Sequence, residues 1–160
     1  VPATAWLYLP GYATLFLLAI LAMERANDFR AALAVVAAST LLAVAAFVGL
    51  AVPAPHRPSP GDAGVAAAMV RWLYTVDPPA NAFPSLHVTN SVICAGVVRR
   101  LWPRAGALAG ALAAGVAIST LTLRQHWLAD VVAGAILGSL GLAAWERLRR
   151  HRSHPTPQAA

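Results

Sequence analysis

The stretch AALAVVAASTLLAVAAFVGLAVPA, residues 31–54, contains no charged side chain. A helix needs ~20 mostly apolar residues to cross the hydrocarbon core of a bilayer, so this stretch predicts a membrane span. Three more uncharged stretches have a similar length: Trp6–Met23, Ala105–Leu123 and Trp127–Trp145. A fifth, from about Ser85 to Trp102, is shorter and more polar. We expect this fifth helix to face other helices and not lipid, because polar side chains are costly in a bilayer.

The composition agrees with a membrane protein, since 59% of the residues are hydrophobic and 11% are charged. Soluble domains ordinarily contain about 25% charged residues. We therefore expect an all-α fold, a polytopic membrane helix bundle of about five transmembrane helices. Residues 1–150 form a single integral-membrane domain in this interpretation, and residues 151–160 a disordered cytoplasmic tail. The chain begins at Val1 and not at a methionine, which leads us to expect a sixth helix upstream.

The long connection from Pro55 to about Pro84 contains one apolar piece, Gly64–Val76. This piece carries Trp72 and Tyr74 and is too short to cross a membrane. We expect it to form a helix that lies on or dips into the outer interface.

All twelve basic residues are arginines, and the formal net charge is +6. They lie at helix ends and form no basic stripe, so we expect no nucleic-acid partner. Three of them, Arg57, Arg71 and Arg124, fall on the side that alternating helices place outside the cell. The other nine follow the positive-inside rule and put the N-terminus outside; they are Arg25, Arg30, Arg99, Arg100, Arg104, Arg147, Arg149, Arg150 and Arg152.

Two histidines and one aspartate lie at the expected helix mouths, where ionisable side chains usually serve a function. They occur in the segments Phe83-Pro84-Ser85-Leu86-His87 and Gln125-His126-Trp127-Leu128-Ala129-Asp130. His126 and Asp130 are four residues apart, so we expect the carboxylate to accept the imidazole N–H on one helical face. Ser85 follows Pro84 at an expected helix start, where free backbone N–H groups favour an anion.

Aromatic and small residues add detail to the last two spans. Trp127 and Trp145 are eighteen residues apart, about 27 Å along a helix, so we expect an interfacial anchor at each end. The pairs Gly106/Gly110 and Gly134/Gly138 predict faces on which helix backbones approach closely. The alternative is that glycine is simply common in membrane helices.

Arg57 and Arg124 share the outer side with both histidines, which indicates an anionic partner. The alternative is that such arginines only snorkel to the interface, an interpretation that we favour for Arg71. Two histidines and one aspartate could also bind zinc. However, the chain has no His-Glu-x-x-His pattern, and neighbouring arginines would repel a cation. We therefore expect no metal and no cofactor.

These motifs resemble those of the type-2 phosphatidic acid phosphatase superfamily, which includes relatives of the vanadium haloperoxidases. The family pattern is Lys-x6-Arg-Pro, then Pro-Ser-Gly-His, then Ser-Arg-x5-His-x3-Asp. The resemblance covers about Arg57 to Gly138, and its three elements are Arg57-Pro58, Pro84-Ser85-Leu86-His87, and Ser119 through His126 to Asp130.

Three residues depart from the family pattern: Leu50, Leu86 and Thr120 replace its lysine, glycine and arginine. The variant Asp77…Asn81-x-Phe83-Pro84-Ser85-Leu86-His87 with Arg124-Gln125-His126 is more similar to the inositol phosphorylceramide synthase-like branch. In that branch a basic residue two before the histidine is usual, so Arg124 would replace the lost arginine.

The resemblance implies that residues 1–150 are a metal-independent catalytic domain acting on a lipid-linked phosphate. His126 would attack the phosphate to give a phosphohistidine, and Asp130 would orient its ring. His87 would protonate the leaving oxygen and then activate the acceptor. The side chains that would hold the phosphoryl oxygens are those of Arg57, Arg124, Ser85 and Ser119.

Three functions remain open. With water as acceptor the protein would be a phosphatase for a phosphomonoester or pyrophosphate, which we favour because no second substrate pocket is evident. With a lipid or polyol hydroxyl it would be a lipid phosphotransferase. The missing lysine and arginine motivate the third, a non-catalytic lipid-phosphate binding or transport protein. For all three functions, we expect the protein to lie in a bacterial inner (plasma) membrane, with its site on the extracytoplasmic face.

Overall fold

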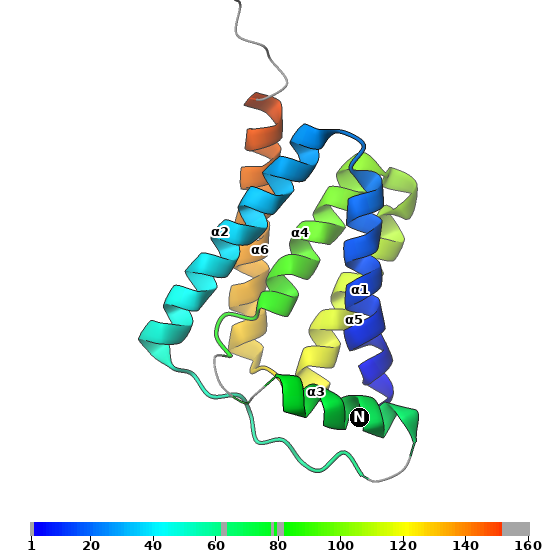
Figure 1. Ribbon diagram of the computed structural model, residues 1–160, viewed down its shortest axis with the longest axis vertical. Coiled ribbons are helices and arrows are strands. Elements are labelled where there is room, and N and C mark those ends of the chain that lie inside the picture. Colours follow the sequence, from blue (N-terminus) through cyan, green and yellow to red (C-terminus); the bar gives the residue numbers. More distant parts are fainter. Residues whose placement is uncertain (1, 62–63, 78, 80–81, 152–160) are drawn as a thin grey trace, which may run out of the picture.

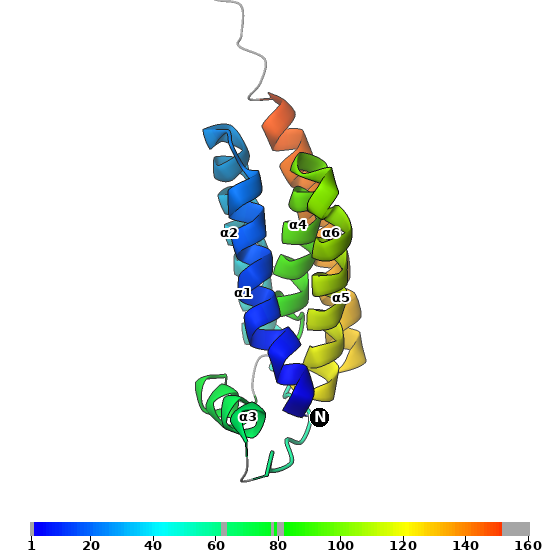
Figure 2. The same cartoon turned by 90° about the vertical axis from the view of Figure 1, so that its right-hand side faces the viewer.

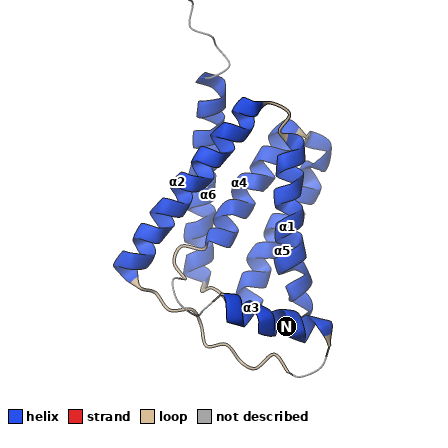
Figure 3. Ribbon diagram, viewed as in Figure 1, coloured by secondary structure: helices blue, strands red, loops and turns tan. Residues whose placement is uncertain are grey.

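The computed structural model describes residues 2–61, 64–77, 79 and 82–151, and within them every regular element is a helix (Figure 3). Short 3-10 turns at Pro2–Thr4 and Pro103–Ala105 precede α1 and α5. The all-α fold expected from the sequence is confirmed. The α-helices are α1 (Ala5–Ala22), α2 (Ala26–Leu50), α3 (Val65–Val76), α4 (Leu86–Leu101), α5 (Gly106–Thr122) and α6 (Leu128–His151).

Four helical segments are long and apolar enough to cross a membrane: α1, α2, α6 and the stretch Pro103–Thr122 that contains α5. Two perpendicular views show them running along a common bundle axis (Figures 1 and 2). The chain is an integral membrane protein on this ground. The helix α4 has 16 residues, about 24 Å of length, so a total of five spans stays a prediction.

The shorter helix α4 lies inside the bundle and packs against α1, α5 and α6. Its polar side chains Thr89, Asn90 and Ser91 are buried among these helices. The expectation that this stretch faces other helices is therefore confirmed.

Glycines let α6 approach α4 at backbone distance. A Cβ on Gly134 would lie 2.5 Å from the carbonyl oxygen of Ser85, and one on Gly138 would lie 2.6 Å from that of Thr89. No larger residue fits at either position without moving a helix, as in other close membrane-helix contacts. The other predicted pair is only half right as a close-packing face: a Cβ on Gly106 would lie 3.3 Å from the Cα of Arg99, whereas one on Gly110 would meet open space.

The helix α2 is displaced from the predicted span toward the N-terminus. It begins at Ala26 and includes Asp28 in its first turn. That carboxylate is buried and lies 3.1 Å from the Arg149 side chain, which explains how a charged residue enters the bundle end. The helix ends at Leu50 because Ala51 adopts φ 45°, a left-handed conformation, and Pro53 follows soon after.

The last helix is longer than predicted, because α6 continues past Trp145 to His151. Trp145 is fully buried and its indole N–H donates to the carbonyl oxygen of Asp28 at 3.1 Å. The prediction of an interfacial anchor at Trp145 is therefore wrong, whereas Trp127 is half exposed. His151 belongs to α6 and not to a tail, and the rest of the predicted tail lies outside the described residues.

The helix α3 lies across one end of the bundle, near the start of α1 (Figures 1 and 2). Its Val70 and Leu73 side chains pack with Tyr8 and Leu123 in a small apolar cluster. Its Trp72 side chain is exposed on the other side. The predicted short helix is confirmed, and it lies at the end of the bundle at which α4 and α6 begin, beside the start of α1 (Figure 1).

Candidate active site

The two histidines come from different helix starts and face each other across a short gap. His87 is the second residue of α4, and His126 precedes α6 by two residues. Their ring centroids are 6.0 Å apart. One small anion between the rings could contact both.

The His126 ring has a defined tautomer. Its Nδ1 lies 2.8 Å from the carbonyl oxygen of Ala82, and a carbonyl oxygen can only accept a hydrogen bond. Nδ1 therefore carries the hydrogen, and Nε2 keeps its lone pair in the neutral ring. Burial lowers the pKa of His126, and the Ala82 carbonyl and the Asp130 carboxylate only partly offset this effect. The neutral, nucleophilic form is thus favoured at neutral pH.

Asp130 and His126 do not share a helical face. The prediction that they do is wrong because α6 begins at Leu128, after His126. An Asp130 carboxylate oxygen lies 3.6 Å from His126 Nδ1 and accepts a hydrogen bond from the Trp127 backbone N–H at 2.8 Å. Asp130 therefore closes the first turn of α6 as the acidic half of a capping box. It can stabilise positive charge on the imidazole without being its hydrogen-bond partner.

Ser85 joins the starts of α4 and α6. Its backbone N–H donates to the carbonyl oxygen of Asp130 at 3.1 Å. Its hydroxyl oxygen accepts from the Val88 backbone N–H at 3.4 Å, so Ser85 caps α4. The backbone N–H groups of Leu86 and His87, in the first turn of α4, have no partner within the helix, which makes this end favourable for an anion beside His87.

Two tyrosines of α1 surround His87. The Tyr8 hydroxyl lies 2.9 Å from His87 Nε2 and 3.1 Å from Nδ1, and the two ring centroids are 4.8 Å apart. The Tyr12 ring lies 5.1 Å from the His87 ring, and its hydroxyl accepts from the Asn90 amide at 3.1 Å. The N-terminal helix α1 thus positions His87.

Arg57 connects the end of α3 to the residue before His126. Its guanidinium donates to the carbonyl oxygen of Asp77 and, at 2.6 Å, to the side-chain oxygen of Gln125. It also lies 5.0 Å from the centre of the Tyr74 ring. Two buried donors of this group, Arg57 Nε and Gln125 Nε2, have no hydrogen-bond partner. An anion in the site would satisfy such donors.

Asp77 contributes a carboxylate to the same surroundings. Burial raises the pKa of Asp77, and the neighbouring Arg57 and His126 oppose that rise. Burial also raises the pKa of Tyr74. A small anion here would meet a mixed field, in which Arg57 supplies attraction and Asp77 supplies repulsion.

Arg124 lies at the mouth of the site. It is exposed and adopts φ 55° in the turn between α5 and α6. With His126, Trp127 and Pro55 it lines an open cavity of about 440 Å³. Its guanidinium forms no hydrogen bond or ion pair with the described part of the chain, so it is free to meet a ligand entering toward His126.

Ser119 has a different setting from the other predicted site residues. It is fully buried, and its hydroxyl donates to the carbonyl oxygen of Val116 within α5 at 2.7 Å. Its hydrogen is thus engaged away from the histidines. Among residues 2–61, 64–77, 79 and 82–151, no group of three or more His, Cys, Asp or Glu side chains could hold a metal ion.

Sequence reasoning missed Tyr8, Gln125 and the Ala82 carbonyl. Tyr8 and Tyr12 are four residues apart in an apolar span, a spacing that could have indicated a polar face. Gln125 adjoins His126 in the sequence, but no local pattern indicates that it meets Arg57. A backbone acceptor has no sequence signature at all.

Comparisons with known proteins identify the fold and the family of the chain. A solved structure described as the first transmembrane PAP2 type phosphatidylglycerolphosphate phosphatase from Bacillus subtilis matches with a TM-score of 0.51 and 16% identity, covering 98% of this chain and 88% of that chain. At this identity the match shows a common fold. No curated protein matches the chain significantly. The family model of the PAP2 superfamily matches residues 3–144. The chain belongs to the PAP2 superfamily.

Proposed function

We propose that this protein is a lipid-phosphate phosphatase that hydrolyses a phosphomonoester or pyrophosphate through a phosphohistidine on His126, without a metal ion. The tautomer of His126 is the observation that carries the proposal. Because Nδ1 donates to the Ala82 carbonyl, the unprotonated Nε2 is the nitrogen that can attack phosphorus.

In the first step, the Nε2 lone pair forms a bond to phosphorus while the bond from phosphorus to the leaving oxygen breaks. His87, which takes up a proton when the anionic substrate binds beside it, gives that proton to the leaving oxygen, so the alcohol or phosphate leaves neutralised. Asp130, 3.6 Å from His126 Nδ1, stabilises the positive charge that the phosphorylated imidazole acquires.

In the second step, His87 takes a proton from a water molecule as that water attacks the phosphohistidine. The nitrogen–phosphorus bond breaks, its electron pair returns to His126, and inorganic phosphate is released. His87 is then protonated again and ready for another turnover. The open cavity beside Arg124 and Trp127 supports access of water to this intermediate.

The phosphoryl oxygens need donors, since stabilising their charge is the main catalytic task in phosphoryl transfer. We assign this role to Arg57, Arg124 and the Ser85 end of α4. Gln125 joins them, because its buried amide nitrogen has no partner. Ser119 could contribute only if its hydroxyl left the Val116 carbonyl.

The substrate is a lipid in this proposal, because the site lies at the end of a bundle of membrane helices and the similar fold belongs to a phosphatidylglycerolphosphate phosphatase. The arginine distribution supports an extracytoplasmic site, and we place the protein in a bacterial plasma membrane. The resemblance to the inositol phosphorylceramide synthase-like branch identifies an alcohol as the competing acceptor. Transfer to an alcohol would use the same first step.

The test is a substrate panel with the purified protein in EDTA. Phosphatidic acid, phosphatidylglycerol phosphate, an isoprenyl pyrophosphate, and phosphatidylinositol with ceramide are each scored for released phosphate and for new lipids. We expect phosphate release that the variant His126→Ala lacks and that His56→Ala, which changes an exposed histidine, retains. New lipid without phosphate would identify a transferase, and no product from any substrate would identify a binding protein.

A further inference from the structure

A polar cavity lies at the end of the bundle opposite the histidines. Its volume is about 240 Å³, and it is formed by the α1–α2 turn together with the final turns of α4 and α6. Its lining residues are Ala22, Glu24, Arg25, Asp28, Arg100, Leu101 and Arg149.

The three arginines that line this cavity differ in whether a carboxylate neutralises them. Arg149 is paired with the buried Asp28 at 3.1 Å, and Arg100 is paired with Glu146 at 2.7 Å. Arg25 is exposed and has no ion pair with the described part of the chain. The exposed Glu24 also lines the cavity. This end of the bundle contains eight described arginines and three carboxylates, which give it a net charge of +5.

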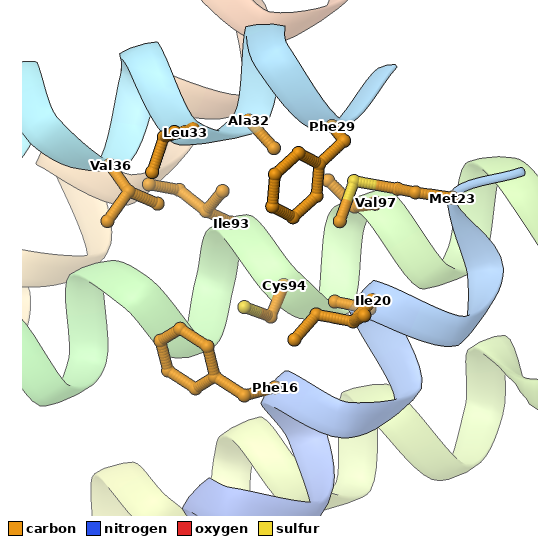
Figure 4. Close-up of a pocket in the computed structure, with 11 residues that line it drawn as sticks. Phe16, Ile20, Met23, Phe29, Ala32, Leu33, Val36, Ile93, Cys94 and Val97 are labelled. Carbon is orange, nitrogen blue, oxygen red and sulfur yellow. The ribbon is translucent and has the colours of Figure 1, made fainter. Parts of the chain in front are cut away.

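An apolar cavity of about 210 Å³ lies beside the polar one, between α1, α2 and α4 (Figure 4). Figure 1 shows α1 and α2 diverging from their common turn, and this cavity opens between them. On α2 it extends from Phe29 to Val36, about 10 Å along the helix. Its lining residues are Phe16, Ala19, Ile20, Met23, Phe29, Ala32, Leu33, Val36, Ile93, Cys94 and Val97.

The two cavities adjoin at the α1–α2 turn, since Ala22 and Glu24 line the polar one and Met23 lines the apolar one. A charged site at a helix end, continued by an apolar cavity at membrane depth, matches the two halves of a phospholipid. We propose that an anionic phospholipid binds here, with its phosphate at Arg25 and Arg100 and one acyl chain between α1, α2 and α4. The net positive charge of this end selects the anionic class.

This lipid is not the substrate. Along α4, His87 and Arg100 are thirteen residues apart, about 20 Å, so a phosphate at Arg100 cannot reach the catalytic rings. The lipid comes from the opposite leaflet, which is the cytoplasmic one in the orientation proposed above. There it fills the space between α1 and α2, and α1 carries the Tyr8 side chain that contacts His87.

The test uses the protein in nanodiscs that contain phosphatidylcholine and a small share of a photoreactive lipid with a diazirine midway along one acyl chain. The probe is phosphatidylglycerol in one sample and phosphatidylcholine in the other, and the labelled residues are mapped by mass spectrometry. We expect phosphatidylglycerol to label the Phe29–Val36 and Ile93–Val97 segments several-fold more than phosphatidylcholine does.

Paired variants test the headgroup contact. Arg25→Gln with Arg100→Gln should reduce this labelling several-fold. Arg30→Gln with Arg104→Gln removes the same charge from exposed positions outside both cavities and should leave it unchanged. Equal labelling by the two lipids, an equal effect of the two variant pairs, or label confined to outward-facing Leu17 and Leu41 would each overturn the proposal. Because the readout is labelling, it does not depend on phosphatase activity.

Discussion

The guanidinium of Arg57 donates to the side-chain oxygen of Gln125 at 2.6 Å, joining two residues that are 68 positions apart in the chain. Gln125 is buried and immediately precedes His126. The hydrogen bond therefore places a cation from the loop after α2 beside the proposed nucleophile. Each remaining buried donor of the pair is available to a phosphoryl oxygen.

Replacement of Arg57 should impair catalysis far more than replacement of Arg71. We expect Arg57→Gln to lower kcat/KM by about 10²-fold or more, because it removes a charged donor to the transition state. The control is Arg71→Gln, since Arg71 donates to the carbonyl oxygen of Gly61 at an exposed position. Steady-state kinetics on one lipid phosphate give both values. Similar losses in the two variants would contradict the assignment of Arg57.

Removal of the Asp130 charge should lower activity less than removal of the triad aspartate does in a serine protease. The Ala82 carbonyl already holds the His126 tautomer, so we expect Asp130→Asn to lose well under the about 10⁴-fold of a triad aspartate. His126→Ala should abolish both turnover and the trapped phosphoenzyme. A phosphoenzyme that persists in His126→Ala would show that another residue is the nucleophile.

Asp130 should also contribute to folding through its cap. Asp130→Ala loses the hydrogen bond from the Trp127 backbone N–H, which should lower stability by about 1 kcal/mol. Asp130→Asn keeps an acceptor oxygen and should unfold at nearly the wild-type temperature. Thermal unfolding in detergent separates the two variants, and equal unfolding temperatures would contradict the capping role.

His87 should be needed mainly for poor leaving groups. In His87→Ala we expect a large loss with an alkyl phosphate and a partial recovery of the first step with an activated aryl phosphate, whose leaving oxygen needs no proton. The phosphohistidine should then accumulate, because no base activates water. Rapid-quench measurement of the phosphoenzyme gives this result. Label recovered on His87 would show that the two histidines have exchanged roles.

The activity profile should reflect the buried setting of His126. Burial lowers the pKa of His126 from 6.5, so the neutral nucleophile persists below that pH, and the acid limb of kcat/KM should lie below pH 6.5. The lowered pKa also makes stability depend on pH. As the pH falls below 6.5, His126 is protonated in the unfolded state before it is protonated in the folded state, so its contribution makes the fold less stable at lower pH. His126→Ala should remove that part of the stability slope. An acid limb above pH 6.5 would contradict the assignment.

Arg124 combines a functional charge with a costly backbone conformation. Its φ of 55° disfavours any residue but glycine by about 1 kcal/mol. We expect Arg124→Gly to keep or slightly raise thermal stability while it lowers kcat/KM. Ala51→Gly relieves a similar conformation, φ 45° at the end of α2, and should leave activity unchanged. A loss of activity in Ala51→Gly as large as that in Arg124→Gly would show that backbone flexibility, and not the lost charge, is responsible.

The sequence alone determined the helical membrane class, the approximate spans and the positions of the motifs. These properties depend on local features, since the length of an uncharged stretch decides whether it can cross a bilayer. Small residues along α6 also predicted a face for close helix contact, whereas its partner α4 became known only from the structure. Helix ends were less accurate, because Asp28 enters α2 only through its ion pair with Arg149, a partner far away in the chain.

Only the tertiary structure decided how the site residues are paired. The hydrogen bonds of His126 with Ala82, of His87 with Tyr8 and of Arg57 with Gln125 each join separate segments. Such partners depend on how helices pack and where loops return, which no periodicity encodes. Trp145 shows the same limit, because its spacing from Trp127 suits an interfacial anchor, whereas packing buries it against Asp28. Burial is a property of the assembled bundle, since it depends on which neighbours cover a side chain.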